Sequence, residues 1–258
     1  MPKVSILMTV CNQSVYVKQA IQSVLNQSFS DWELLIADDA SSDDSVETIR
    51  SFVGNDARVS VLSNVTRLGV SANRNLALQN MVGEYVAVLD ADDVWVDNNK
   101  LEKQVKYLDE NMDCVLVSGN ARYIDAKGAV LRETNFPVGD EIIRKVILSK
   151  NVIIHSAAMY RLKDANTVGG YADLRVGEDY DLWLRLGQIG KFCILPDFLV
   201  NYRLSDNQAT KEKVLDILWT NIMIVRKYAG RYPKANLALW RRLFRYMAYW
   251  PISKFFVK

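Results

Sequence analysis

The sequence predicts an α/β protein with a mostly parallel, Rossmann-like sheet, helices on both faces of that sheet, and a helical extension at the C-terminal end. Short runs dense in Val, Ile and Leu alternate with amphipathic stretches through the first 120 residues, as expected where strands are buried on both faces. Most intervening stretches are long enough for a helical crossover between parallel strands. Half of the 258 residues are apolar, with only 12 Gly and 5 Pro, so the chain can bury a sizeable core and is not of low complexity.

The first half of the chain accounts for the sheet and its crossovers. The strands that we expect lie at 4–10, 33–37, 59–62, 85–89 and 114–119, and the helices at 15–27, 45–53, 71–81 and 98–110. The first of these helices carries Ala20, Ile21 and Val24 on one stripe, the spacing of an amphipathic helix. Strands alternating with helices in this way predict a doubly wound sheet.

Beyond residue 120 the pattern is less regular. We expect two short strands around a turn at Lys127-Gly128, a helix at 139–149, an apolar run at 152–160, a helix at 178–189 and a strand at 192–203 that Pro196 interrupts. No linker rich in Gly, Ser or Pro divides the chain. Residues 1–210 are therefore interpreted as one domain and residues 211–258 as its helical extension.

The extension is basic and aromatic. Lys and Arg number 32 against 30 Asp and Glu, yet residues 217–258 hold nine basic side chains and no acidic one. In a helical projection Trp240, Leu243, Phe244, Met247 and Ala248 share one arc, Arg241, Arg242 and Arg245 share another, and Pro251 ends the helix. Residues 236–258 are thus typical of a helix on an anionic membrane surface; the alternative is packing on the body with solvated arginines. The acidic body and the lack of a binding motif argue against a nucleic-acid partner.

Cysteine and histidine usage limits the metal and the compartment. The three cysteines, Cys11, Cys114 and Cys193, are far apart in the sequence, and there is one histidine. We expect no disulfide framework, a reducing compartment and no zinc site, so that any metal is an oxygen-bound Mn²⁺ or Mg²⁺. Since the sequence shows neither a signal peptide nor a membrane-spanning segment, we expect a cytoplasmic protein with peripheral contact at the inner face of the cell membrane.

Acidic side chains follow two of the expected strands. Asp38 and Asp39 follow 33–37, and Asp90, Asp92 and Asp93 follow 85–89. In an open parallel sheet, ligands bind beyond the carboxyl ends of the strands, so both clusters would face one crevice. Asp92 and Asp93 suit a divalent cation that holds phosphates, while Asp38 and Asp39 suit a ribose hydroxyl or a base. The alternative is that these are solvated turn acids and helix caps.

The familiar phosphate-binding loops are missing. The turn after the first strand, CNQSVYV, has no glycine, so neither a dinucleotide-binding loop nor a P-loop is present. This disfavours a Rossmann-type oxidoreductase. Arg67 and Arg74, on either side of Gly69, are the nearest cations for a diphosphate; the alternative is that they are surface arginines at the start of a helix.

Five segments carry a family resemblance. They are VSILMTVCNQ, SVLNQSFSDWELLIADDASSDDS, GVSANRN, LDADD and GEDYDLWLRL. In this order and spacing they resemble the family-2 glycosyltransferases with the GT-A fold, of the kind that build bacterial polysaccharides and other glycans. The resemblance extends over residues 3–205. The chain departs from the family at Cys11, where Tyr is frequent, and at Ala40, where Gly is commoner.

The resemblance implies a role for particular residues of this chain. It places Thr9, Cys11 and Asp39 at the nucleoside, Arg74 at the diphosphate, Asp92 at the ribose or metal, and Asp93 on the metal. Asn12 and Asp38 are further candidates for the nucleotide site. It also implies that Asp179, with Glu178 beside it, supplies the catalytic base. Acids in the first turn of a helix are otherwise explained by the helix dipole.

The resulting hypothesis is an inverting hexosyltransferase that moves a sugar from a nucleotide diphosphate, most simply UDP, to a saccharide or lipid-linked glycan. A base deprotonates the acceptor hydroxyl, and a metal stabilises the departing diphosphate. Trp95 and His155 are candidates for the acceptor side, although ordinary core packing explains them as well. The alternative function is a non-catalytic nucleotide-sugar-binding scaffold module at a membrane assembly.

Overall fold

The computed structural model describes residues 1–204 and 214–256, with side chains described as far as residue 249. It confirms the α/β fold with a mostly parallel sheet. The strands are β1 (Val4–Val10), β2 (Trp32–Asp38), β3 (Val59–Ser63), β4 (Tyr85–Val88), β5 (Val94–Trp95), β6 (Cys114–Ile124), β7 (Val130–Glu133), β8 (Met159–Arg161) and β9 (Lys191–Arg203). They lie in the order β3-β2-β1-β4-β8-β6-β9-β5, with β7 paired to β6.

Strand direction follows the predicted doubly wound pattern in the first half of the chain. β1 pairs in parallel with β2 and β4, and β2 pairs in parallel with β3. β8 is inserted antiparallel between β4 and β6, and β9 then pairs in parallel with β6. The two-residue strand β5, which the sequence did not suggest, pairs antiparallel with β9. This pairing matters because β5 begins directly after the acidic segment 90–93.

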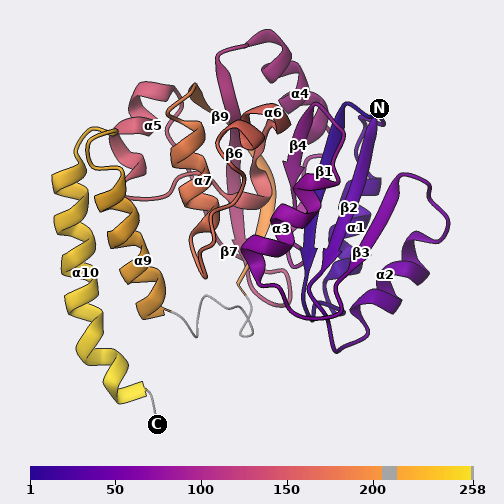
Figure 1. Ribbon diagram of the computed structural model, residues 1–258, viewed down its shortest axis with the longest axis horizontal. Coiled ribbons are helices and arrows are strands. Elements are labelled where there is room, and N and C mark those ends of the chain that lie inside the picture. The colour runs from indigo at the N-terminus through magenta and orange to yellow at the C-terminus, as the bar shows by residue number, and fades with distance from the viewer. Residues whose placement is uncertain (205–213, 257–258) are drawn as a thin grey trace.

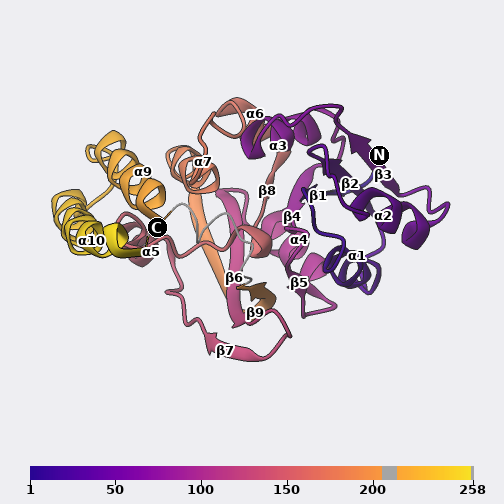
Figure 2. The same ribbon diagram turned by 90° about the horizontal axis from the view of Figure 1, so that it is seen from below.

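Helices cover both faces of the sheet (Figures 1 and 2). They are α1 (Val17–Leu25), α2 (Ser45–Val53), α3 (Val70–Gln79), α4 (Lys100–Glu110), α5 (Asp140–Ile147), the short 3₁₀ turn η1 (His155–Ala157), α6 (Leu162–Thr167), α7 (Glu178–Leu186), α9 (Val214–Lys227) and α10 (Ala235–Phe256). One apolar core joins α1, α2 and α4 to the sheet, and a second joins α3, α5, α7 and α9 to the opposite face. None of these described helices is long and apolar enough to cross a membrane.

Two prolines behave differently from the prediction. β9 runs through Pro196 without interruption, and the carbonyl of Pro196 accepts a hydrogen bond from Nδ2 of Asn120 at 3.0 Å. The register with β6 shifts beside Asn120, which is where a strand tolerates a residue without an N–H. Pro251 does not end the last helix, since α10 continues to Phe256; one missing backbone hydrogen bond does not stop a helix of this length.

The C-terminal helices form an antiparallel pair at the end of the molecule opposite β2, β3 and α2 (Figure 1). α9 buries Ile224 and Val225 against the same core as α7. α10 buries Ala238. Arg242, predicted to lie on a basic face, is instead buried and donates to the carbonyl of Leu148 at 3.2 Å. The prediction for 250–258 rests on side chains that lie outside the described residues.

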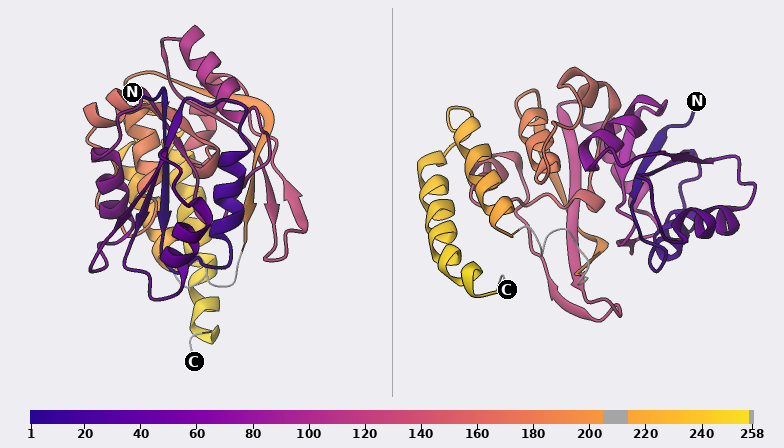
Figure 3. Two further views of the ribbon diagram at one scale, coloured as in Figure 1. Left: turned by 90° about the vertical axis from the view of Figure 1, so that its right-hand side faces the viewer. Right: turned by 60° about the horizontal axis from the view of Figure 1, so that its bottom comes forward.

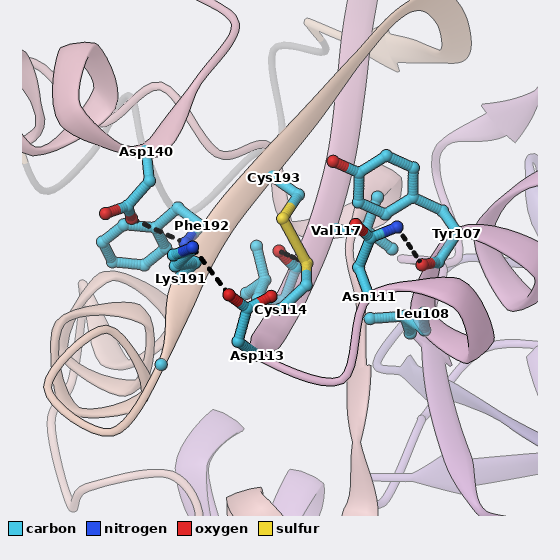
Figure 4. Close-up of a disulfide and its surroundings, with 12 residues drawn as sticks. Tyr107, Leu108, Asn111, Asp113, Cys114, Val117, Asp140, Lys191, Phe192 and Cys193 are labelled. Atoms are coloured by element: carbon cyan, nitrogen blue, oxygen red, sulfur yellow. Dashed lines mark hydrogen bonds and ion pairs between the residues drawn. A yellow bond between two sulfur atoms is a disulfide. The ribbon is translucent and has the colours of Figure 1, made fainter.

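A disulfide joins Cys114 and Cys193, with their Cα atoms 6.4 Å apart (Figure 4). The expectation that the cysteines do not pair is therefore wrong for these two. β6 and β9 are parallel neighbours, and adjacent strands bring Cα atoms within the range that a disulfide spans. Cys11 keeps its thiol. The inference of a reducing compartment, which rested on unpaired cysteines, loses its support.

Candidate functional site

The two acidic clusters lie at the same edge of the sheet, as predicted. β1 lies between β2 and β4, and all three run in the same direction. Asp38 is the last residue of β2, and the backbone N–H of Asp39 donates to the carbonyl of Val10 at the end of β1. Asp90 follows β4 after one intervening residue. Because neighbouring parallel strands end together, residues about 50 apart in the sequence line one region.

Hydrogen bonds hold the turn after β1 against the loop after β2. Asn12 adopts a left-handed backbone conformation with φ of 55°. Its side-chain oxygen accepts from the N–H of Ser42 at 2.8 Å, and its own N–H donates to Oγ of Ser41 at 2.9 Å. The thiol of Cys11 donates to the carbonyl of Asp39 at 3.6 Å. Burial raises the pKa of that thiol, and nearby Arg67 offsets only part of the effect.

The two acids at the end of β2 differ in their partners. The carboxylate of Asp39 accepts from the N–H groups of Leu68 at 2.6 Å and Gly69 at 3.0 Å, and so fixes the loop that leads into α3. Asp38 accepts from the N–H of Ser41 at 3.2 Å, while its Oδ1 is buried without a hydrogen-bond partner among the described residues. A buried acceptor without a partner is costly, and a ligand hydroxyl would satisfy it. Thr9 is half-buried beside Ala37 of β2.

Arg74 connects the segment after β4 to the start of α7. Arg74 is 7 % exposed, and its guanidinium forms an ion pair with Asp90 at 2.9 Å and a second one with Glu178. Burial alone would lower the pKa of Arg74, but Asp90 and Glu178 together raise it. The ring of Tyr171 lies 5.5 Å from the guanidinium carbon. In this structure the charge of Arg74 is thus directed to two carboxylates, and a buried pair of this kind is costly to break.

His155 extends this network on the other side of Asp90. Its Nδ1 lies 3.0 Å from Oδ2 of Asp90 and its Nε2 lies 3.0 Å from the hydroxyl of Tyr171, which in turn lies 3.2 Å from that of Tyr160. Burial alone would raise the pKa of Asp90, but His155 and Arg74 hold it well below its usual value. His155 is 6 % exposed. It therefore belongs to a buried polar chain at the base of the site.

Asp93 is held by backbone and side-chain donors from two distant segments. Oγ of Ser156 donates to Oδ2 at 2.5 Å, and the N–H of Arg203 donates to Oδ1 at 2.8 Å. The guanidinium of Arg203 also donates to the carbonyl of Asp92 at 2.8 Å. Burial, then the charges of Asp92 and Asp90, raise the pKa of Asp93 well above its usual value. Like charges gathered in this way favour a cation in their midst.

The donor chemistry of Asp92 and Asp93 fits Mn²⁺ or Mg²⁺, which take carboxylate oxygens. Within the part of the chain that the structure describes, no three His, Cys, Asp or Glu side chains are grouped so that they could hold a metal ion. A cation at this position would therefore need further oxygens from a bound diphosphate and from water. This is the usual arrangement for Mg²⁺ sites that bind phosphates.

Asp179 lies in the first turn of α7, directly after Glu178. Its side chain is half-buried, whereas Glu178 is buried. Burial, together with the neighbouring carboxylate of Glu178, raises the pKa of Asp179, although His155 and Arg74 partly oppose this. Asp179 directly follows Glu178, whose ion pair with Arg74 belongs to that network. A carboxylate with a raised pKa is suited to accept a proton.

Trp95, a candidate for the acceptor side, is buried, and the sequence analysis did not predict some other residues of the site. Trp95 is 3 % exposed and its indole N–H donates to the carbonyl of Ser156 at 2.7 Å, so it packs beneath the site. The sequence reasoning did not single out Ser156 or Tyr171, and it made no claim for the segment that contains Arg203. Tyr171 and Ser156 carry no local signal, because their roles arise only from pairing across the fold.

Solved structures with the same fold include two nucleotide complexes. TarS residues 1–349 of Staphylococcus aureus in complex with UDP-GlcNAc matches with a TM-score of 0.72 and 16% sequence identity, over 96% of this chain and 73% of that one. The mannosyltransferase PcManGT of Pyrobaculum calidifontis, in complex with GDP-Man and Mn²⁺, matches with a TM-score of 0.69 and 16% identity, over 96% and 75% of the two chains. The fold is thus GT-A.

Sequence comparison gives the family. The chain is 32% identical over 219 residues to an uncharacterized glycosyltransferase of Methanocaldococcus jannaschii, covering 82% of this chain and 75% of that protein. It is 28% identical over 218 residues to the chondroitin synthase of Escherichia coli, covering 84% of this chain and 31% of that protein. The family model described as "Glycosyl transferase family 2" matches residues 5–169. Together with the fold, this match shows that the chain belongs to glycosyl transferase family 2.

Proposed function

We propose that this protein is an inverting glycosyltransferase that moves a sugar from a UDP-sugar to a saccharide or lipid-linked glycan. The observation that supports the proposal most is the bridge made by Arg74, which binds Asp90 and Glu178 at once. This bridge joins the segment after β4, which we assign to the donor diphosphate, to the segment that carries Asp179. A transferase needs these two chemistries on either side of one sugar carbon.

The proposed reaction is a single in-line displacement. Asp179 takes the proton of the acceptor hydroxyl as that oxygen attacks the anomeric carbon, and the bond from this carbon to the diphosphate oxygen breaks. Attack from the face opposite the leaving group inverts the anomeric configuration. Glu178 does not take part in proton transfer on this proposal, because its ion pair with Arg74 commits it to holding the start of α7.

Donor binding is assigned to the edge of the sheet formed by β1, β2 and β4. We assign the Oδ1 of Asp38, which is buried without a hydrogen-bond partner among the described residues, to accept from a nucleoside hydroxyl. Asp39, whose carboxylate holds the loop at Leu68 and Gly69, would act on the nucleoside through that loop. Asp92 and Asp93 would hold Mn²⁺ or Mg²⁺, which when bound offsets the charge of the leaving diphosphate.

The relatives support the choice of substrates. TarS is described with UDP and with UDP-GlcNAc, and one relative is a chondroitin synthase. We therefore propose a UDP-sugar donor and a glycan acceptor, with the enzyme acting at a membrane surface. None of the described helices is long and apolar enough to cross a membrane.

The test is a screen of nucleotide sugars, followed by thermal stabilisation and by metal-dependent release of UDP. We expect one donor to stabilise the protein, and we expect Asp179→Asn to retain that stabilisation while turnover falls by at least about 100-fold. Asp173→Asn, at an exposed aspartate before α7, is the matched control. Full turnover in Asp179→Asn would contradict the proposal. Donor binding without transfer to any acceptor would instead favour the nucleotide-sugar-binding scaffold.

A further inference from the structure

The outer face of α10 carries a stripe of large apolar side chains that the protein leaves in solvent. Leu237, Trp240, Phe244 and Met247 are 46%, 70%, 70% and 58% exposed. Their spacing of three and four residues gathers them within about 80° of the helix surface. A contiguous exposed apolar stripe of this kind is uncommon on a protein that has no partner there. We call these four residues the apolar stripe.

The apolar stripe is not the face by which α10 packs on the body. Ala235, Ala238 and Arg242 are buried, and the ring of Tyr246 lies 5.7 Å from that of Trp219 on α9. These contacts fix α10 from one side and turn the apolar stripe outward. The helix therefore has two apolar faces, of which only one is used within the described part of the chain.

Positive charge flanks the apolar stripe. Arg241 and Arg245 are both exposed and lie on the adjacent side of α10. From residue 217 to residue 258 the chain has nine Lys and Arg and no Asp or Glu, so α10 itself contains no acid that could neutralise them. Tryptophan, phenylalanine and arginine on one outward face are the composition of a helix that lies in the plane of an anionic membrane surface.

The direction of α10 relates this surface to the candidate site. α10 runs towards the same end of the molecule at which β1 and β2 end (Figures 1 and 3). A bilayer that covered the apolar stripe would lie against the side of the molecule opposite β2 and β3, with the strand ends that carry Asp38 directed along the membrane surface rather than into it. A lipid-linked acceptor would be held in the same bilayer.

We infer that the apolar stripe and its flanking arginines dock the protein on an anionic lipid surface, with α10 parallel to the membrane plane. This inference rests on the proposed function for its purpose, since it supplies the acceptor. Its physical basis is independent of catalysis, because lipid binding requires neither donor nor metal.

The test is co-sedimentation of the full chain with vesicles of phosphatidylcholine alone or with added phosphatidylglycerol. We expect binding to the anionic vesicles that weakens as salt increases. The triple variant Trp240→Ser, Phe244→Ser, Met247→Ser should bind at least tenfold more weakly. The matched control is Met112→Ser, Leu131→Ser, Ile142→Ser, which removes three side chains that are 69%, 57% and 52% exposed elsewhere and should bind as the parent does.

The charge contribution has its own pair of variants. Arg241→Glu with Arg245→Glu should lose at least tenfold in affinity for anionic vesicles, whereas Lys18→Glu with Arg50→Glu, at exposed positions on α1 and α2, should not. Equal binding to both lipids, or equal loss in the controls, would overturn the inference. So would a parent protein that dimerises through this face in light scattering and ignores vesicles. UDP release in solution, measured in parallel, reports on the proposed function separately.

Discussion

At the scale of single residues, the main finding concerns the division of labour between Glu178 and Asp179. The sequence resemblance assigned both to catalysis and Arg74 to the diphosphate. In the structure, Arg74 and Glu178 are buried and ion-paired, while Asp179 is half-buried beside them. Since 104 positions separate Arg74 from Glu178, no local pattern could have revealed this pair. Glu178 is accordingly interpreted as a positioning residue.

This division predicts different pH profiles for two variants. Burial and Glu178 raise the pKa of Asp179. Because the base must be deprotonated, kcat/KM should rise with pH, and the midpoint of this acidic limb should lie above the pKa of an ordinary aspartate. Glu178→Gln removes one of the causes of the raised pKa and should shift that limb to lower pH while turnover persists. Asp179→Asn should abolish the limb together with turnover. A Glu178→Gln limb at the parental pH would show that the two carboxylates are not coupled in this way.

Ala40 provides a second prediction at this scale, about stability. It is the residue where the family more often has Gly, and its φ is 52°, a conformation that costs a residue with a Cβ about 1–2 kcal/mol. Ala40→Gly relieves that strain but frees the unfolded chain by about 0.5–1 kcal/mol. We expect a net gain of about 0.5–1 kcal/mol in the free energy of unfolding by urea. Ala172→Gly, at a half-buried alanine without positive φ, should lose stability instead.

At the scale of elements, α4 contains a buried lysine for which neither the proposed chemistry nor the sequence pattern gives a reason. Lys100 is 0% exposed, its Nζ lies 2.7 Å from Oε1 of Gln104, and the ring of Trp95 lies 4.1 Å away. Burial lowers the pKa of Lys100 well below its usual value, and Asp97 opposes this only in part. An uncharged amine is the form that such surroundings favour.

The lysine gives stability a definite pH dependence. The unfolded chain binds a proton at Lys100 that the folded chain releases, so stability should rise with pH until the unfolded pKa near 10.5 is passed. Lys100→Met should remove this dependence and raise the free energy of unfolding at pH 7 by about 1 kcal/mol or more. Lys106→Met, at a lysine that is 73% exposed on the same helix, should change it by less than about 0.5 kcal/mol. Parallel stability curves for Lys100→Met and the parent from pH 7 to 10 would contradict this.

The elements also show what the sequence could and could not predict. The strands and helices of the first half were predicted within a few residues, because strands buried on both faces read as continuous apolar runs, as Ile6 to Met8 do. β5 has only two residues and no pattern of its own; it exists because Val94 and Trp95 pair with β9. The insertion of β8 between β4 and β6, and the disulfide across β6 and β9, are likewise long-range pairings.

At the scale of the whole molecule, a buried carboxylate on α7 adds a polar attachment for the C-terminal helices to their shared apolar core. Asp181 on α7 is 0% exposed. It accepts hydrogen bonds from Nζ of Lys227, the last residue of α9, at 2.7 Å and from the hydroxyl of Tyr228, the next residue, at 2.8 Å. Arg185 on α7 itself adds a third donor at 2.8 Å. Asp181 is two residues from Asp179, so the helix that contains the proposed base is also the helix to which α9 is hydrogen-bonded.

This attachment predicts unequal effects for two aspartates that link α9 to the body. Asp181→Asn leaves three donors facing a neutral amide and should lower the free energy of unfolding by about 2–4 kcal/mol. Asp216→Asn breaks a pair with Arg175 at 3.7 Å in which both side chains are more than half exposed, and should cost less than about 1 kcal/mol. Thermal unfolding measures both, and hydrogen exchange should rise in α9 and α10 only for Asp181→Asn.

The same variant distinguishes a merely attached extension from one that supports the site. If α9 holds the start of α7 in place, Asp181→Asn should lower kcat more than it weakens donor binding. The reason is that Asp38 and Asp39, which we assign to the donor, lie on other elements. The expected loss in kcat is about tenfold, since a base displaced slightly from the attacking hydroxyl loses much of its effect. Unchanged kcat with faster exchange in α9 would show instead that residues 1–204 hold Asp179 in place without the C-terminal helices.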